Sequence, residues 1–184
     1  NYAEAFYNIG VVLKDQGKVN EAISSYYKAL KINPNFAEVY NNIGLLHADQ
    51  GDLNEALKLF QKALTLKPDF AEAYNNMGIC FYNQKKLKEA IISYNKSLSI
   101  NSEYVNALYN KSLALFELGE EEKAINTCKK SILLNPSYFE AHCKLGDFFH
   151  HKGHFNLAIE SYNKAICINP YHIDSYNNKG VALH

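Results

Sequence analysis

The stretch FAEVYNNIG, residues 36–44, returns as FAEAYNNMG at residues 70–78, and its second half returns as YNNKG at residues 176–180. The glycines that end the two longer stretches, Gly44 and Gly78, are 34 positions apart, and four series of residues keep that spacing along the chain. These series are Gly10, Gly44, Gly78, Ser112, Gly146, Gly180; Ala22, Ala56, Ala90, Ala124, Ala158; Tyr26, Phe60, Tyr94, Cys128, Tyr162; and Pro34, Pro68, Ser102, Pro136, Pro170. A fixed period of this length indicates a repeat protein, so one repeat predicts the fold.

Residues 37–70 give the clearest single repeat. Its first half has apolar side chains at helical spacing, namely Val39, Tyr40, Ile43, Leu46 and His47. Gly51 is suited to end this helix, because glycine readily adopts positive φ. Asn54 is a good N-cap for a second helix, which Pro68 ends. Each repeat is therefore predicted to be a pair of antiparallel helices joined by a short turn.

One helix pair cannot bury both of its apolar faces, so the pairs are expected to stack into an α-solenoid. Gly44 and Ala56 are small because the two helices of a pair cross closely there. The first helices are predicted at about 3–16, 37–50, 71–84, 105–118, 139–152 and 173–184, and the second helices at about 20–32, 54–66, 88–100, 122–134 and 156–168.

Composition excludes several classes of function. Nineteen basic and nineteen acidic residues leave no net charge to attract nucleic acid or an anionic membrane. No apolar run is long enough to span a membrane, and no signal peptide opens the sequence. The four cysteines form no cluster, which favours reduced thiols and a cytoplasmic or nuclear location.

No catalytic or cofactor-binding motif is present, so we expect no enzyme activity from these residues and no cofactor. The best candidate for a metal site is HHKGH at residues 150–154. Zinc would require further ligands converging on His150 and His154, and Gly153 ends the helix between them. These histidines are therefore interpreted as exposed turn residues, and no metal is expected.

The repeated pattern resembles the tetratricopeptide repeat: an aromatic residue, an aliphatic residue before glycine, then a large residue, Ala, an aromatic residue, Ala and Pro. The resemblance covers nearly the whole chain. It implies an all-α fold, a right-handed α–α superhelix formed by one array with repeats at about 3–36, 37–70, 71–104, 105–138 and 139–172 and a partial repeat at 173–184. Local departures are Lys111, Ser112, Cys128 and Ser102 around the fourth repeat and Lys179 in the sixth.

The asparagines of the repeated triplet follow the same period. The main register contains Asn8, Asn42, Asn76, Asn110, Lys144 and Asn178, and Asn41 and Asn75 lie beside it. Asparagine is a poor residue inside a helix, and the apolar stripe points elsewhere, so we expect these amides to face solvent. The resemblance places the first helices along a concave groove. A carboxamide can both donate and accept, so the row is predicted to hold the backbone of an extended peptide. The alternative is that asparagine is simply common in this sequence.

A recurrent acid, at Glu4, Glu38, Glu72, Glu140 and Asp174, has two interpretations. Asn35, Asp69 and Ser137 each precede a glutamate by three residues, the spacing of a capping box. The alternative is an acidic stripe that binds a basic ligand. Capping is the preferred interpretation.

The function predicted from the sequence is a scaffold for protein–protein interaction that binds a protein or peptide ligand. The alternative rests on resemblance: the blocks AEAFYNIGVVLKDQG and AEAYNNMG are similar to the repeat superhelix of protein O-linked sugar transferases, such as O-GlcNAc transferase and Spindly. That resemblance implies a substrate-binding arm whose catalytic domain lies outside this chain. A carboxylate clamp for chaperone tails is disfavoured, because only Lys144 is basic in its register. The partial repeat suggests a fragment of a longer protein, whose uncovered ends are expected to self-associate.

Overall fold

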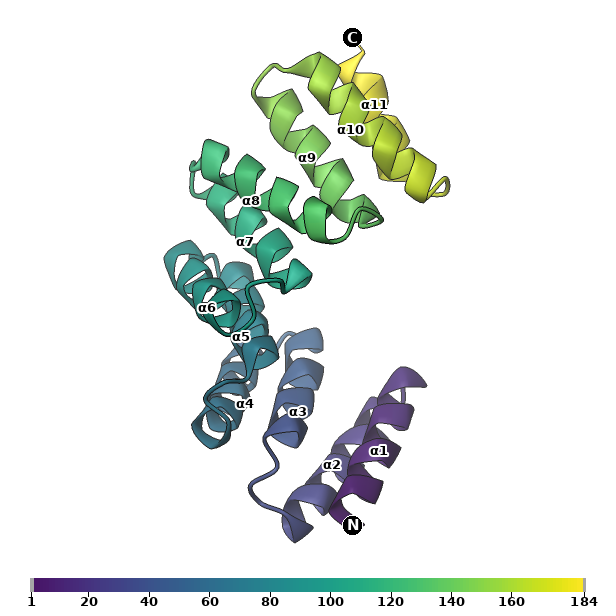
Figure 1. Cartoon of the computed structure of the whole chain (residues 1–184). Helices are drawn as coiled ribbons and strands as arrows, with labels where there is room; N and C mark the ends of the chain where they lie inside the picture. The colour runs from purple at the N-terminus through teal and green to yellow at the C-terminus, as the bar shows by residue number, and fades with distance from the viewer. Residues whose placement is uncertain (1, 184) are drawn as a thin grey trace. The chain divides into compact units, whose positions relative to one another are not determined.

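In the computed structural model, residues 2–183 are described, and they form helices joined by short turns (Figure 1). The chain divides into two compact units, Asn1–Lys86 and Leu87–His184. The first unit contains α1 (Tyr2–Asp15), α2 (Val19–Ile32), α3 (Ala37–Asp49), α4 (Leu53–Leu66) and α5 (Ala71–Asn83). The second contains α6 (Leu87–Ile100), α7 (Val105–Glu117), α8 (Glu121–Leu134), α9 (Phe139–His151), α10 (Phe155–Ile168) and α11 (Ile173–Ala182).

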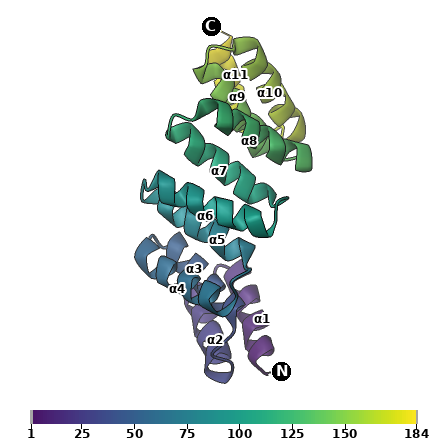
Figure 2. The same cartoon turned by 60° about the vertical axis from the view of Figure 1, so that its left-hand side comes forward.

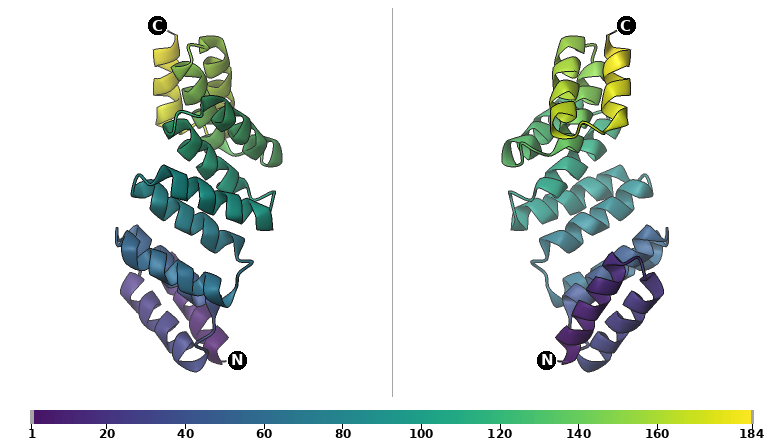
Figure 3. Two further views of the ribbon diagram at one scale, coloured as in Figure 1. Left: turned by 90° about the vertical axis from the view of Figure 1, so that its left-hand side faces the viewer. Right: turned by 90° about the vertical axis from the view of Figure 1, so that its right-hand side faces the viewer.

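In the first unit α1 pairs with α2 and α3 with α4, and in the second unit α7 pairs with α8 and α9 with α10, each pair antiparallel. Figure 3 shows α1 beside α2 in the first unit, and Figure 2 shows α7 beside α8 in the second. Every described helix starts and ends within two residues of its predicted position. The predicted all-α solenoid class of stacked helix pairs is therefore confirmed.

The turn between the helices of a pair depends on one residue with positive φ. Gly51 has a φ of 84°, as predicted, and the equivalent Gly17, Gly119 and Gly153 also have positive φ. In the third repeat Lys85 takes this place with a φ of 61°. A left-handed conformation is unfavourable for a residue that has a Cβ, so Lys85 is a point of backbone strain.

The predicted helix caps are wrong in detail. Asp52, not Asn54, is the N-cap of α4, and its side chain accepts a hydrogen bond from the Glu55 backbone N–H at 3.2 Å. The helix begins one residue earlier than predicted, which places Asn54 inside its first turn.

The capping boxes predicted at Asn35, Asp69 and Ser137 do not form. The N-caps of α3, α5 and α9 are Phe36, Phe70 and Tyr138, none of which makes a side-chain capping bond. Because each of these helices starts one residue later than a capping box requires, the acid occupies the second helical position. One of these acids, Glu38, instead pairs with Lys67 at 2.8 Å.

In the first, second and fifth repeats the interior of the helix pair is built on contact between a glycine and an aromatic ring. A Cβ placed on Gly44 would lie 2.7 Å from the Phe60 ring, and one on Gly146 would lie 2.5 Å from the Tyr162 ring. Phe60 is completely buried, as is Ala56 on the same helix. The prediction that the helices cross closely at the small residues is confirmed, and the aromatic side chain explains why the glycine is required.

The fourth repeat replaces this pair by Ser112 and Cys128, both fully buried. The smaller cysteine leaves room for the serine Cβ, and the two substitutions compensate each other. The Ser112 hydroxyl donates to the Tyr109 carbonyl oxygen at 2.6 Å, and the Cys128 thiol donates to the Ala141 carbonyl oxygen at 3.3 Å. Burial raises the pKa of the Cys128 thiol to about 12, so it behaves as a packing residue.

Exposed apolar side chains are frequent on α11, where Ile173 and Val181 are 71% and 62% exposed. Self-association through such surfaces stays a prediction. None of the helices described between residues 2 and 183 combines the length and apolar character needed to cross a bilayer.

Candidate functional site

The asparagine row lies on the first helix of each pair. In the first unit Asn8, Asn42 and Asn76 lie on α1, α3 and α5, and in the second unit Asn110, Lys144 and Asn178 lie on α7, α9 and α11. Asn8 is exposed, and the three members in the second unit are partly buried.

The expectation that these amides face solvent is wrong for α3 and α5. Asn41 and Asn75 are 1% and 3% exposed, and Asn42 and Asn76 are 8% and 6% exposed. The physical reason is that neighbouring first helices approach closely enough to enclose the polar side chains between them. Burying an amide is costly unless its donors and acceptors are paired, so their hydrogen bonds decide their role.

These amides bond to one another across neighbouring repeats. Asn76 Nδ2 donates to Asn41 Oδ1 at 3.0 Å, and Asn41 Nδ2 lies 3.5 Å from Glu72 Oε1. Asn75 Nδ2 donates to Asn76 Oδ1 at 3.4 Å. The paired asparagines therefore connect α3 to α5. Contact of these amides with a ligand stays a prediction, and it would require these bonds to break.

Asn42 makes a similar connection to the first repeat. Its Nδ2 lies 3.4 Å from both the Tyr7 and the Tyr26 hydroxyl oxygens. Burial raises the pKa of Tyr26 to about 12, so its hydroxyl stays protonated at physiological pH. Asn42 thus joins α3 to both helices of the preceding pair.

The second unit contains an open pocket at two members of the row. The pocket has a volume of about 310 Å³ and is lined by Tyr109, Glu140, Cys143, Lys144, His172, Asp174 and Asn178. The first helices α7, α9 and α11 supply most of this lining, and His172 is the N-cap of α11. We call it the row pocket, because Lys144 and Asn178 belong to the asparagine row.

Asp147 holds the two row residues through hydrogen bonds. Its carboxylate accepts hydrogen bonds from Asn178 Nδ2 and the Tyr162 hydroxyl, each at 2.9 Å, and from Lys144 Nζ at 2.8 Å. After these bonds Asn178 retains one N–H and its carbonyl oxygen, and Lys144 retains two N–H groups. These remaining groups match the N–H and C=O pattern of a peptide backbone.

The electrostatics of the row pocket are mainly acidic. Burial opposes the charged form of Lys144, but the hydrogen bond and negative charge of Asp147 outweigh that effect and raise the pKa of Lys144. The ammonium group is therefore paired already. Among residues 2–183, no ion pair neutralises Glu140, whereas the equivalent Glu38 pairs with Lys67. Asp174 Oδ2 lies 3.9 Å from His172 Nε2, which forms an ion pair only when the imidazole is protonated. The row pocket thus keeps the negative charge of Glu140 and, while His172 is neutral, that of Asp174.

Asp147 is not among the residues predicted from the sequence, although a signal is present there. The equivalent positions in the other repeats are Val11, Leu45, Ile79, Leu113 and Val181. One carboxylate in a series of aliphatic residues is the departure that could have identified it.

The two histidine candidates for a metal site each lie against an aromatic ring. The His150 ring lies 5.4 Å from the Phe155 ring, and the His154 ring lies 6.4 Å from the Phe149 ring. No group of three or more His, Cys, Asp or Glu residues suited to a metal ion occurs in the part of the chain that the structure describes.

Comparison with known proteins agrees with this architecture. A family model described as "TPR repeat" matches residues 12–51 and 44–85, and models described as "Tetratricopeptide repeat" match residues 71–104, 105–138 and 139–172. A comparison with curated protein sequences gives no match.

Several solved structures are similar to this chain. MamA is 28% identical with a TM-score of 0.75, and the match covers 88% of this chain and 95% of MamA. TTC0263 from Thermus thermophilus is 22% identical with a TM-score of 0.80, covering 98% of each chain. YrrB, described as a TPR protein with an unusual peptide-binding site, is 21% identical with a TM-score of 0.73, covering 95% of this chain and 90% of YrrB. Because the family models together match residues 12–172, most of its length, the chain belongs to the tetratricopeptide repeat family.

Proposed function

We propose that this chain is a protein-interaction scaffold, not an enzyme, and that it holds an extended peptide segment against its first helices. The observation that carries the proposal is the row pocket, in which Lys144 and Asn178 are held by Asp147 with donors and an acceptor left over. Other members of the fold offer a precedent, since YrrB is described as having a peptide-binding site.

The asparagine row contributes to this function through its accessible members. In the second unit Asn110, Lys144 and Asn178 are partly exposed, and they are the proposed contacts there. In the first unit the exposed Asn8 is a separate candidate contact. The buried amides of α3 and α5 instead fix the spacing of the helices.

The charge of the row pocket favours one kind of ligand side chain. Glu140 and Asp174 face a cavity whose one lysine is already paired with Asp147. A lysine or arginine side chain of the peptide would balance this charge, and the Tyr109 ring can add a cation–π contact. The proposed ligand is therefore an extended peptide with a basic residue.

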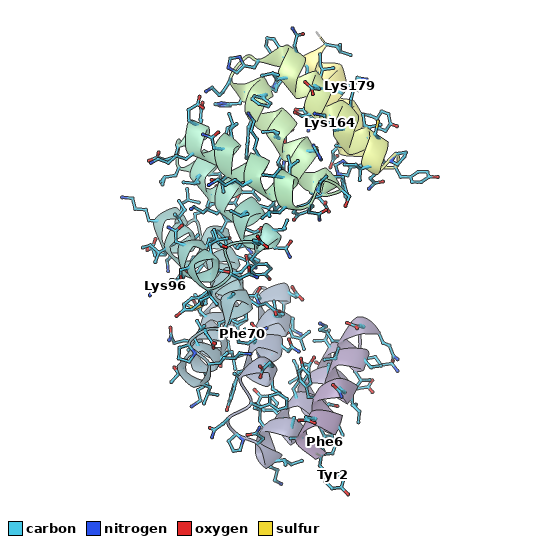
Figure 4. The ribbon with its side chains drawn as sticks, viewed as in Figure 1. Tyr2, Phe6, Phe70, Lys96, Lys164 and Lys179 are labelled. Carbon is cyan, nitrogen blue, oxygen red and sulfur yellow. The ribbon has the colours of Figure 1, made fainter. Side chains whose placement is uncertain are left out.

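The test begins with selection of random unstructured peptides by display on the 184-residue chain. Selected peptides are then titrated calorimetrically into the wild type, Lys144→Ala, Asn178→Ala and a matched control, Lys164→Ala. Lys164 is an exposed lysine on α10 whose surface pair with Glu160 is worth little (Figure 4). Loss of one or two hydrogen bonds at roughly 0.5–1.5 kcal/mol each predicts binding weaker by about tenfold for Asn178→Ala.

Backbone recognition has its own signature. Proline or N-methyl substitutions in the peptide should weaken binding more than most side-chain substitutions, because they remove backbone N–H groups. Equal affinities for Lys144→Ala, Asn178→Ala and Lys164→Ala would refute the row pocket as the site.

An alternative proposal is the substrate-binding arm of a protein O-linked sugar transferase. It rests on the sequence blocks at residues 3–17 and 71–78 alone. A sugar-nucleotide-binding α/β domain in the same open reading frame would support it, and a reading frame that lacks one would refute it.

A further inference from the structure

A lysine on α7 occupies a position that four of the other five repeats fill with an apolar residue, which is fully or nearly buried in the second and fifth repeats. The equivalent residues are Ile9, Ile43, Met77, Lys111, Leu145 and Lys179. Ile43 is completely buried and Leu145 is 8% exposed, whereas Lys111 is only half-buried. The substitution places an ammonium group where the fold normally packs hydrocarbon.

Lys111 opens onto a pocket formed by three helices of the second unit. The pocket has a volume of about 400 Å³ and is lined by Ile91, Asn95, Lys111, Leu115, Lys123, Asn126, Thr127 and Lys130, from α6, α7 and α8. We call it the lysine pocket. Its lining contains three lysines, two amides and a hydroxyl, and no carboxylate.

The positive charge of the lysine pocket is largely uncompensated. Lys123 pairs with Glu120 at 2.9 Å. In the described part of the chain, neither Lys111 nor Lys130 forms an ion pair, although both also line an adjoining pocket that contains Glu103. Burial and then the charge of Lys130 lower the pKa of Lys111, so its ammonium group is both poorly solvated and repelled.

An anion in the lysine pocket would relieve both effects. Asn95 and Asn126 can donate hydrogen bonds in addition to the ammonium groups. The two unpaired lysines match a phosphoryl group, which carries a charge of about −1.5 to −2 at pH 7 and three strong acceptor oxygens. A carboxylate would leave one ammonium group uncompensated.

We propose that the lysine pocket binds a phosphoryl group, either as free phosphate or on a phosphorylated side chain of a partner polypeptide. The lysine pocket shares no lining residue with the row pocket. The proposal therefore adds a second, anion-specific site to the proposed peptide-binding function, and the two sites can be tested separately.

The test is NMR titration of the folded chain with inorganic phosphate, a short phosphoserine peptide and its glutamate counterpart. The variants are Lys111→Met and Lys130→Met, and the control is Lys179→Met, which removes a lysine of the same register on α11 (Figure 4). Lys111→Met should fold, because α5 has Met77 at this position.

We expect saturable shifts at α6–α8 in the wild type and in Lys179→Met, with affinity at least tenfold lower in the other two variants. Equal affinity for phosphate and the phosphoserine peptide supports free phosphate as the ligand, and tighter binding of the peptide supports a phosphorylated partner. The proposal is refuted if shifts do not saturate, if the glutamate peptide binds equally well, or if Lys111→Met binds like the wild type. The last result would mean that Lys111 merely extends its stem over apolar surface.

Discussion

Replacing Asn76 by alanine tests whether the buried amides hold neighbouring repeats together. The change removes the 3.0 Å hydrogen bond to Asn41 Oδ1 and leaves that oxygen without its donor on a side chain that is 1% exposed. An unsatisfied buried polar group costs about 1–3 kcal/mol. The better helix propensity of alanine offsets roughly 0.5 kcal/mol of this destabilisation. We therefore expect Asn76→Ala to lower the free energy of unfolding by about 0.5–2.5 kcal/mol.

Asn8→Ala is the matched control. Asn8 occupies the same register on α1 but is exposed, so its replacement removes an amide that is already in water. Because alanine has the better helix propensity, Asn8→Ala should raise the free energy of unfolding by roughly 0.5 kcal/mol. The assay is urea unfolding followed by circular dichroism, with the two variants compared at an unchanged slope so that midpoints report stability.

A double-mutant cycle isolates the bond itself. Asn41→Ala, Asn76→Ala and the double variant should show a coupling energy on the order of 1 kcal/mol, because the partners are in direct contact. If Asn76→Ala instead raised stability as much as Asn8→Ala, the amides would not connect the repeats. The asparagines of α3 and α5 would then behave as solvent-facing residues, as their register alone predicts.

Three further outcomes are expected. Lys85→Gly should stabilise the chain by about 0.5–1 kcal/mol in urea unfolding, because glycine adopts the left-handed backbone conformation at this position without strain. Gly51→Lys should destabilise the chain for the opposite reason. Lys111→Met should stabilise by about 1 kcal/mol at pH 7 through burial of apolar surface. Because burial lowers the folded-state pKa of Lys111, the wild type is penalised at neutral pH and relieved as pH rises through that pKa, so the gain should shrink in alkaline urea titrations. Hydrogen exchange should show residues 105–134 opening more readily than residues 37–66. Equal protection would mean that the substitutions in the fourth repeat do not lower its local stability.

The helices could be predicted because residues that favour the same local structure recur at equivalent positions of each repeat. Glycine at the close crossing leaves room for an aromatic ring, glycine at the turn allows positive φ, and proline after the second helix ends it. Their common period sets every boundary. Single caps were less predictable. Asp and Asn side chains can both cap a helix. Which of Asp52 and Asn54 caps α4 depends on the residue at which the turn after Gly51 ends and the helix begins.

The burial of the asparagines could not be predicted from their register. A period of 34 shows that Asn42 and Asn76 share a face, but not how closely the neighbouring helix covers it. The distance between neighbouring first helices depends on how the second helices and their aromatic residues pack. The sequence of one first helix does not determine that packing. The row pocket is partly predictable for the same reason: the register identifies Lys144 and Asn178, but it does not identify Asp147.

Because residues 34 positions apart are equivalent, each residue can be compared with its counterparts in the other repeats. Two charged residues that depart from their counterparts, Asp147 and Lys111, differ in how well the fold compensates their charge. Asp147 replaces an aliphatic residue but accepts hydrogen bonds from Lys144, Asn178 and Tyr162, so its charge is satisfied within the fold. Lys111 also replaces an aliphatic residue, yet the charged group that acts on it is Lys130, of the same sign. A buried charge that lacks an opposite charge destabilises the unliganded protein. Asp147 is therefore a structural support for the row pocket, whereas the cost of burying Lys111 is the physical reason to expect an anionic ligand beside it.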